Sequence, residues 1–186
     1  MMQVTFGLRS VFILVLVMVL TVSMTSCLPR GAAPEVHLLA SPLSWKPEAS
    51  ALIVREVSIP SYVNQSSLMQ LNDDGTIEAL SGCRWAMPLR ESLLEAVNCA
   101  LSSREAAYSG SGKCTFILEL PVFIITGGRV LNVRGTIINN STGARHGIAF
   151  EKSLNGGKLD AAAAGRLHRE AVEQLAAEII DFANSR

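Results

Sequence analysis

The cysteine at position 27 is the residue whose surroundings most directly predict covalent chemistry. An apolar run, Val11–Leu20, follows Arg9, and small residues then lead through Ser26 to the cysteine. A positive start, a short apolar centre and small residues at the cleavage site are typical of a signal peptide. Small residues followed directly by cysteine are the layout of a bacterial lipoprotein signal. We therefore expect residues 1–26 to be a lipoprotein signal peptide that is removed, and Cys27 to be lipidated.

The residues on either side of this cysteine predict the kind of membrane attachment. Met24 stands where such signals usually have leucine, and it keeps an unbranched apolar side chain. The apolar run is shorter than the about 20 residues of a membrane-spanning helix, so cleavage is favoured over an uncleaved membrane helix. Each buried CH₂ of an acyl chain such as palmitate contributes about 0.8 kcal/mol, and several chains anchor a protein permanently. Leu28 replaces the Asp of an inner-membrane retention signal, so we expect anchoring in the outer membrane, facing the periplasm.

A second stretch has the composition of a phosphate-binding loop. Gly110–Lys113 reads Gly-Ser-Gly-Lys. A Walker A motif also needs a glycine five residues before the Gly-Lys pair and a Ser or Thr after it. Ala107 and Cys114 occupy those positions. The stretch is therefore interpreted as a flexible loop, and no nucleotide or other cofactor is expected.

Histidines and cysteines show no catalytic or metal-binding signature. The three histidines fall on three separate elements: His37, His146 and His168. The cysteines after Cys27 lack a CxxC pair or a neighbouring histidine: Cys83, Cys99 and Cys114. Zinc sites and hydrolase motifs need such spacings. We therefore expect no catalytic residue and no metal, and a protein that is not an enzyme. Three cysteines leave open whether any two of them form a disulfide.

Composition limits the partners and the number of domains. Without residues 1–26 the chain has 160 residues, 15 basic and 16 acidic side chains. This length suits one domain with a substantial core, and the balanced charge does not favour nucleic acid as a partner. The Pro-, Gly- and Ala-rich start predicts a lipidated N-terminus and tether over residues 27–50, followed by a single α+β domain over residues 51–186.

Hydrophobic periodicity predicts strands joined by hairpins, with two helices. Short apolar or alternating segments indicate strands at residues 36–39, 51–60, 67–71, 76–80, 115–125, 131–137 and 145–152. Apolar stripes indicate helices from Leu89 to Leu101 and from about Asp160 to about Ala183. The expected fold class is α+β, an antiparallel β-sheet built from hairpins with two main amphipathic helices packed on one face.

The strand 115–125 carries two further predictions. Pro121 indicates either an edge position or a bulge, and Gly127–Gly128 indicates a tight hairpin turn. The strand is also apolar on both faces. One face must pack against the helices. The other is covered by another subunit, lines a groove that accommodates lipid, or is buried within the monomer.

One motif carries a resemblance to a known family. Arg84-Trp85-Ala86-Met87-Pro88-Leu89, followed by a helix, resembles the Arg-Trp-Ala-Glu-Pro-Leu signature of the ABC-type transport auxiliary lipoproteins, the PqiC-like family. Met87 departs from the usual Glu. Upstream, Val54–Tyr62, which ends in Ser-Ile-Pro-Ser-Tyr, resembles the family's strand ending in Leu-Pro-x-Tyr. We expect Arg84, Trp85, Pro88 and Leu89 to serve the fold, with Trp85 as a core anchor and Arg84 paired with a carboxylate or backbone carbonyls.

The resemblance implies a function in transport. Members of the family are accessory parts of Mce-type lipid transport systems, and they meet a periplasmic Mce-domain protein that works with an inner-membrane permease. The leading hypothesis is a non-enzymatic lipoprotein that docks the transport conduit to the outer membrane and supports membrane integrity. A lipoprotein that binds lipid on its own is the alternative, and a lipoprotein hydrolase is the weakest. A homo-oligomer and a lipid ligand both stay open.

Overall fold

The computed structural model describes residues 35–37, 39, 50–157 and 159–185. The chain divides into two compact units, Met1–Ala33 and Pro34–Arg186, and all described residues belong to the second. The predicted signal peptide, Cys27 and most of the predicted tether lie outside the described residues.

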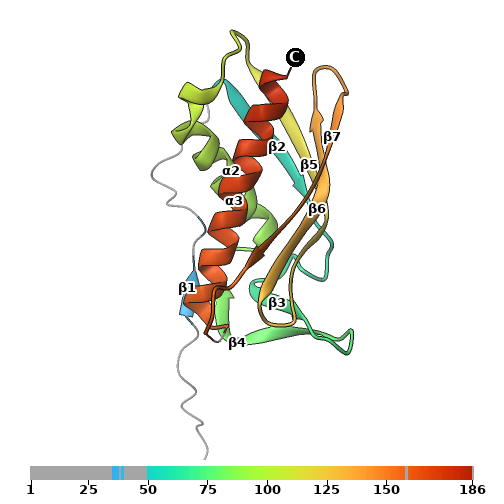
Figure 1. Cartoon of the computed structure of the whole chain (residues 1–186), viewed down its shortest axis with the longest axis vertical. Coiled ribbons are helices and arrows are strands. Elements are labelled where there is room, and N and C mark those ends of the chain that lie inside the picture. Colours follow the sequence, from blue (N-terminus) through green and yellow to red (C-terminus); the bar gives the residue numbers. More distant parts are fainter. Residues whose placement is uncertain (1–34, 38, 40–49, 158, 186) are drawn as a thin grey trace, which may run out of the picture. The chain divides into compact units, whose positions relative to one another are not determined.

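The described strands form one seven-stranded sheet (Figure 1). Its strands are β1 (Glu35–His37), β2 (Leu52–Ser58), β3 (Ser67–Leu71), β4 (Ile77–Trp85), β5 (Cys114–Thr126), β6 (Val130–Asn139) and β7 (Arg145–Ser153). The order is β1-β4-β3-β5-β6-β7, and β2 also pairs with β5. The predicted hairpins β3–β4, β5–β6 and β6–β7 are antiparallel. The sheet is mixed, however, because the β1–β4, β2–β5 and β3–β5 pairs are parallel.

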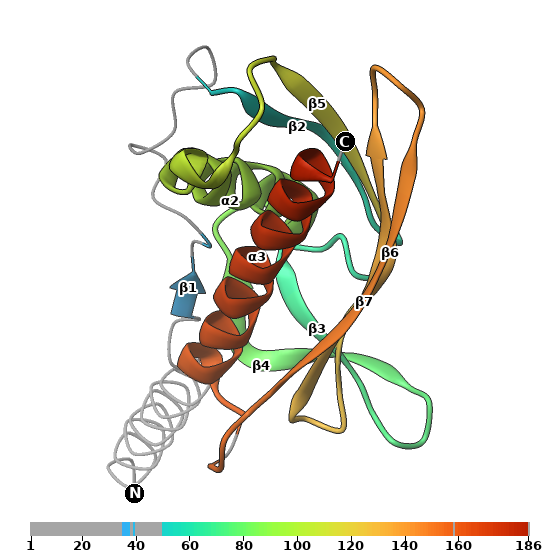
Figure 2. The same ribbon diagram turned by 45° about the horizontal axis from the view of Figure 1, so that its top comes forward.

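Two helices pack against the same face of this sheet (Figure 2). Helix α2 (Leu89–Ser103) lies against β2, and α3 (Ala161–Asn184) lies against β6, β7 and α2. A short 3₁₀ turn, η1 (Glu105–Ala107), follows α2. Asp160 caps α3 as predicted, because its Oδ1 accepts a hydrogen bond from the backbone N–H of Ala163 at 2.7 Å. The α+β class is thereby confirmed.

Strand β5 is the centre of the sheet because three other strands pair with it. One edge of β5 pairs with β2 over Cys114–Glu119 and with β3 over Ile125–Thr126, and the other edge pairs with β6. Pro121 lies between the two parallel partners, where the register with β6 shifts between Glu119 and Val122. Proline has no N–H to donate to a ladder. Of the two predicted explanations for Pro121, the structure therefore has the bulge.

The two faces of β5 differ in burial. Phe116, Leu118 and Ile125 face the helices and are completely buried. Ile117 and Val122, on the opposite face, are half-buried. The predicted hairpin turn is present at Gly127 and Gly128, whose φ values of 53° and 62° lie in the left-handed region that glycine adopts easily. The helices thus cover one face of the strand, and the other retains solvent-accessible apolar surface.

Candidate functional site

The family motif runs from the end of β4 into α2, and its side chains alternate between core and surface. Trp85 and Leu89 are 4% and 3% exposed. Arg84 and Pro88 are exposed. The structure therefore brings Trp85 and Leu89 into the core and leaves Arg84 and Pro88 on the surface. This arrangement supports a structural role for Trp85 and Leu89, which stays a prediction until motif variants are measured.

Trp85 belongs to an aromatic junction that we define as Trp85, Phe123 and His168. The rings of Trp85 and His168 meet edge-on, with centroids 4.8 Å apart and planes at 68°. The rings of Phe123 and His168 lie 5.5 Å apart. Edge-to-face contacts of this kind are favourable beyond the area they bury. The junction joins β4, β5 and α3, so the motif tryptophan connects the sheet to the terminal helix.

His168 is held neutral within this junction. It is 3% exposed, and its burial lowers the pKa from 6.5 to about 4, although a hydrogen bond to the Ala164 carbonyl opposes the shift. The ring nitrogen Nδ1 lies 2.7 Å from that carbonyl oxygen, so a neutral ring with a proton on Nδ1 donates to it. A buried neutral imidazole packed between two aromatic rings acts here as a core side chain.

The other predicted candidates do not come together. His146 stacks on Phe182 with centroids 5.2 Å apart, and its Nε2 lies 3.5 Å from Glu178 Oε2. The three cysteines of the described region lie on β4, α2 and β5: Cys83, Cys99 and Cys114. Cys114 Sγ is 3.4 Å from the Tyr108 hydroxyl. Within the described residues, no group of three His, Cys, Asp or Glu side chains could hold a metal ion.

Two asparagines form hydrogen bonds that hold α2, the helix that follows the motif, in place. Asn64 Oδ1 accepts a hydrogen bond from the Arg90 backbone N–H at 3.0 Å, so a loop side chain caps the start of α2 where Pro88 offers no side-chain bond. Asn98, 1% exposed, makes two bonds to the backbone of Val54. Sequence reasoning missed both. The available signal was a polar residue at position 98 within an apolar helical stripe.

The structure contradicts the contacts predicted for Arg84, which were a carboxylate or backbone carbonyls. Its side chain is exposed and makes no ion pair or hydrogen bond with any residue in the described part of the chain. In the sheet, its register partner on β1 is Val36, which is 62% exposed. Among the described residues, Tyr62 and Ile77 are the other large apolar side chains with high exposure, at 45% and 40%.

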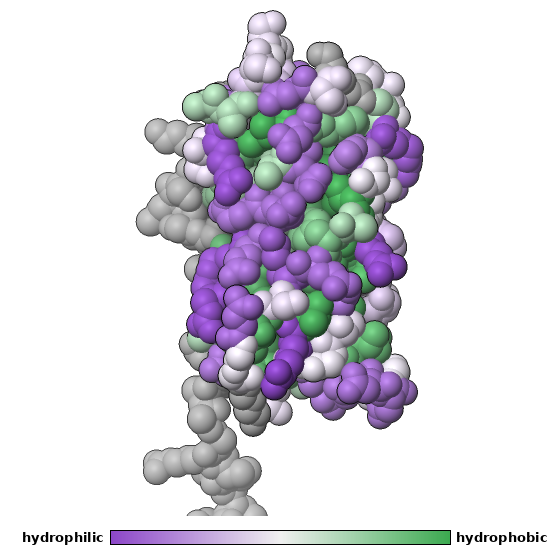
Figure 3. Space-filling view, viewed as in Figure 1, coloured by the Kyte–Doolittle hydropathy of each residue, from purple (hydrophilic) through white to green (hydrophobic). Residues whose placement is uncertain are grey.

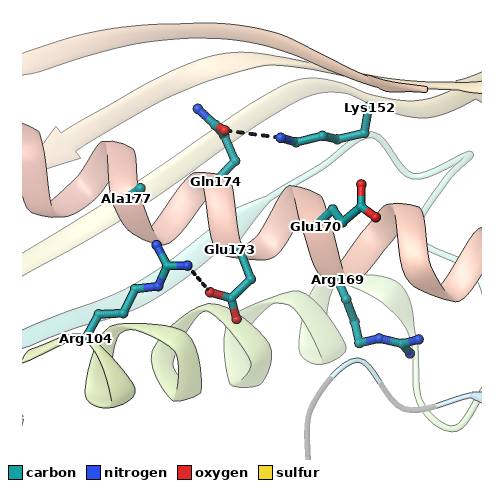
Figure 4. A pocket seen from close by; sticks show the side chains of 7 residues that line it. All are labelled: Arg104, Lys152, Arg169, Glu170, Glu173, Gln174 and Ala177. Carbon is teal, nitrogen blue, oxygen red and sulfur yellow. Dashed lines mark hydrogen bonds and ion pairs between the residues drawn. The ribbon is translucent and has the colours of Figure 1, made fainter. Parts of the chain in front are cut away.

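A shallow polar pocket of about 400 Å³ lies on the outward side of α3 (Figure 4). Arg104 pairs with Glu173 at 2.6 Å, and Lys152 Nζ lies 3.2 Å from Gln174 Oε1. Hydrophilic side chains also cover the surface over the middle of this helix (Figure 3). Exposed pairs of this kind contribute about 0–1 kcal/mol, and the pocket is interpreted as a solvated helix face.

Among the residues that the structure describes, no helix is long and apolar enough to cross a membrane.

Comparisons with known proteins agree with the motif. A family model described as ABC-type transport auxiliary lipoprotein component matches residues 39–113, which include β2, β3, β4, the motif and α2. One similar solved structure, an uncharacterised protein, has a TM-score of 0.64 and 15% identity over 80% of this chain and 97% of its own. Protein XCC0632 from Xanthomonas campestris, assigned to DUF330, has a TM-score of 0.55 and 16% identity over 80% and 91%. These two likenesses establish the fold. No curated protein matches the chain.

Proposed function

Since residues 39–113 identify this chain as a member of the ABC-type transport auxiliary lipoprotein components, we propose that it is a non-enzymatic, lipid-anchored accessory protein of an Mce-type lipid transport system. In this role it faces the periplasm and docks the transport conduit to the outer membrane, which supports membrane integrity. Its partners are a periplasmic Mce-domain protein and, through it, an inner-membrane permease.

The family match over β2–α2 is the observation that carries this proposal. The placement of the histidines supports a role without catalysis, because His168 is consumed by packing in the aromatic junction and His146 stacks on Phe182. A hydrolase needs a nucleophile, a base and an orienting group within hydrogen-bond reach of one another. His168 is instead buried in core contacts with Trp85 and Phe123.

The lipid anchor is proposed from the sequence around Cys27, where small residues precede the cysteine and Leu28 follows it. Several acyl chains on one cysteine hold a protein at the bilayer effectively irreversibly. A protein held in this way and lacking an ATP-binding loop fits an accessory role, in which another chain supplies the energy.

The test is capture of the partner in cells. A tagged full-length chain is crosslinked in the envelope and purified, and the captured proteins are identified by mass spectrometry. The proposal expects an Mce-domain protein that is absent when a tagged lipoprotein of another fold is used. Recovery of the chain as a lone monomer, together with unchanged lipid traffic after its deletion, would exclude this function.

Direct lipid binding is the second candidate, favoured by one observation. The face of the sheet opposite the helices carries four half-buried aliphatic side chains on β2, β5 and β6: Ile53, Ile117, Val122 and Ile138. An apolar patch of this kind is suited to an acyl chain. Native mass spectrometry of the purified protein distinguishes the two, because a co-purifying phospholipid supports this candidate and its absence from the mature protein counts against it.

A further inference from the structure

The first strand after the predicted lipidation site lies at one end of the described domain. Strand β1 pairs with the last residues of β4, and α3 contacts it (Figure 1). The C-terminus of α3 and the β6–β7 turn lie at the opposite end in both views (Figures 1 and 2). The domain therefore has a near end, marked by β1, and a far end, marked by that turn.

The covalent chain limits how far the near end can be from Cys27. Eight peptide units join Cys27 to Glu35, and an extended chain spans at most about 3.5 Å per residue, so the two Cα atoms are no more than about 28 Å apart. Helix α3, with 24 residues, is about 36 Å long and runs from the near end toward the far end. A cysteine anchored in a bilayer thus keeps the near end close to the membrane.

One exposed pair at the near end has the chemistry of a membrane contact. Val36 and Arg84 are register partners on β1 and β4, so their side chains lie next to each other on one face of the sheet. That face is opposite the one on which Trp85 packs against His168. Val36 is 62% exposed, and Arg84 is exposed with no partner among the described residues. An apolar side chain beside an unpaired guanidinium suits the boundary between acyl chains and headgroup phosphates.

The carboxylates of the same hairpin do not pair with Arg84, and Glu78 on β4 accepts a hydrogen bond from Gln70 Nε2 instead. Asp73 and Asp74 occupy the β3–β4 turn, at the other end of β4. Arg84 pairs with Ser67 and Ile77 pairs with Leu71, so four residues of β3, or about 13 Å, separate Arg84 from the start of β4. The carboxylates of the turn therefore lie beyond ion-pair distance of Arg84, which makes no ion pair with any described residue.

From these observations we infer that the exposed face of the β1–β4 pair, at Val36 and Arg84, rests on the lipid surface that holds Cys27, with Arg84 binding headgroup phosphates. This inference rests on the proposed lipid anchoring. It gives the exposed motif arginine a ligand, and it leaves the far end of the domain pointing into the periplasm.

The test places a tryptophan at each end of the mature lipidated protein. Val36→Trp reports on the near end, and Ser141→Trp, in the exposed β6–β7 turn, is the matched control. Each protein is reconstituted into vesicles of phosphatidylethanolamine and phosphatidylglycerol with brominated acyl chains, which quench tryptophan within the bilayer. The unsubstituted protein supplies the background from Trp45 and Trp85. We expect quenching of Val36→Trp and none of Ser141→Trp.

Arg84 is then varied in the Val36→Trp protein. Arg84→Glu should lower the quenching by about half or more, and Arg84→Lys should retain it, since one cation near an anionic surface is worth about a fivefold change in local binding. High salt should weaken the contact in the arginine protein. Because Arg84 is exposed, circular dichroism should show that these variants remain folded.

Three results would overturn the inference: equal quenching at the two ends, unchanged quenching with Arg84→Glu, or an N-terminal peptide without acyl mass at Cys27. The vesicles contain no transport protein, so this outcome is independent of partner capture in cells. If quenching is lost but the Mce-domain partner is still captured, only the inferred membrane-facing surface is refuted. If quenching is observed but no Mce-domain partner is captured, the membrane-facing surface is supported and the proposed transport role is refuted.

Discussion

The carboxamide of Asn98 forms two hydrogen bonds with the backbone of a single residue, Val54. Its Oδ1 accepts from the Val54 N–H and its Nδ2 donates to the Val54 carbonyl, both at 2.9 Å. Val54 lies where the β2–β5 register shifts. A side chain of α2 thus satisfies the backbone of a strand at the point where the parallel ladder is interrupted.

Replacing Asn98 by alanine should destabilise the protein. The Val54 N–H and carbonyl would both lose their partner in a buried site, and an unsatisfied buried polar group costs about 1–3 kcal/mol. We expect the free energy of unfolding to fall by about 3 kcal/mol in urea titrations. Arg166→Ala on the exposed side of α3 is the control and should change it by no more than about 0.5 kcal/mol. Equal stability of the two variants would contradict the assigned role of Asn98.

Truncating Trp85 should separate the structural part of the motif from its exposed part. Trp85→Ala should cost about 3–5 kcal/mol because it empties a buried site beside His168. Arg84→Ala should leave the free energy of unfolding within about 0.5 kcal/mol, since Arg84 is exposed. A double-mutant cycle of Trp85→Ala with His168→Ala should give a coupling of about 1 kcal/mol. Coupling indistinguishable from zero would show that the ring contact adds nothing to burial.

Acid should destabilise the fold through His168. Its pKa is about 4 in the folded state, lowered from 6.5 chiefly by burial. Above pH 6.5 the ring is neutral in both states and the full stability is present. As the pH falls from 6.5 to about 4, the unfolded state takes up a proton that the folded state refuses, so about 3 kcal/mol is lost.

The measurement is the free energy of unfolding against pH for the unsubstituted protein and for His168→Phe. Phenylalanine keeps an aromatic ring in the junction and cannot titrate. The difference between the two curves should slope between pH 6.5 and 4 and be flat above 6.5. Parallel curves over the whole range would show that burial does not keep His168 neutral.

A methyl group should not fit at Gly135. A Cβ there would overlap the backbone oxygen of Glu119 on the neighbouring strand, so the β5–β6 ladder would have to move. We expect Gly135→Ala to lower the free energy of unfolding by about 2–3 kcal/mol. Gly147→Ala on β7 is the matched control, because its added Cβ meets nothing within 4 Å. The same substitution lowers the conformational entropy of the unfolded chain. A Gly135→Ala protein as stable as Gly147→Ala would contradict the close approach.

Removing the anchor should abolish activity and leave the domain folded. Cys27→Ser cannot be acylated, so the protein should fail to restore the membrane integrity of a deletion strain, measured as detergent resistance. Cys114→Ser keeps the signal sequence and should restore it. Circular dichroism should give the same melting temperature for the mature domain of each. Full restoration by an unlipidated Cys27→Ser protein in the periplasm would refute the role of anchoring.

Local patterns were sufficient to predict the hairpins and the helix starts. Gly127–Gly128 and the Asp160 cap depend on the conformations of a few neighbouring residues, and both are present as expected. The parallel pairs were not predicted, because β2 and β3 find their partner on β5 after α2 has intervened in the chain. Hairpin signals carry no information about such pairings.

The contacts of the motif could be predicted only in part. Trp85 before a helix indicates a core anchor, but its partner His168 lies far along the chain on α3. The Asn64 cap and the Asn98 bonds likewise join residues 26 and 44 positions apart. Side-chain chemistry shows that these groups need partners. Which partners they find depends on how the helices are placed on the sheet, and no local pattern specifies that placement.

The sharing of one edge of β5 by β2 and β3 has a consequence for how the chain folds. Strands β2 and β3 both precede β5, which begins at Cys114. Neither the β2–β5 pair nor the β3–β5 pair can therefore form while the emerging chain ends before that residue. Pairings between distant segments slow folding. A fragment ending at Lys113 would contain the entire region matched by the family model, yet its β2 would expose an unpaired edge. Such a fragment should aggregate rather than fold. The domain can therefore reach its folded structure only after β5 has been synthesised.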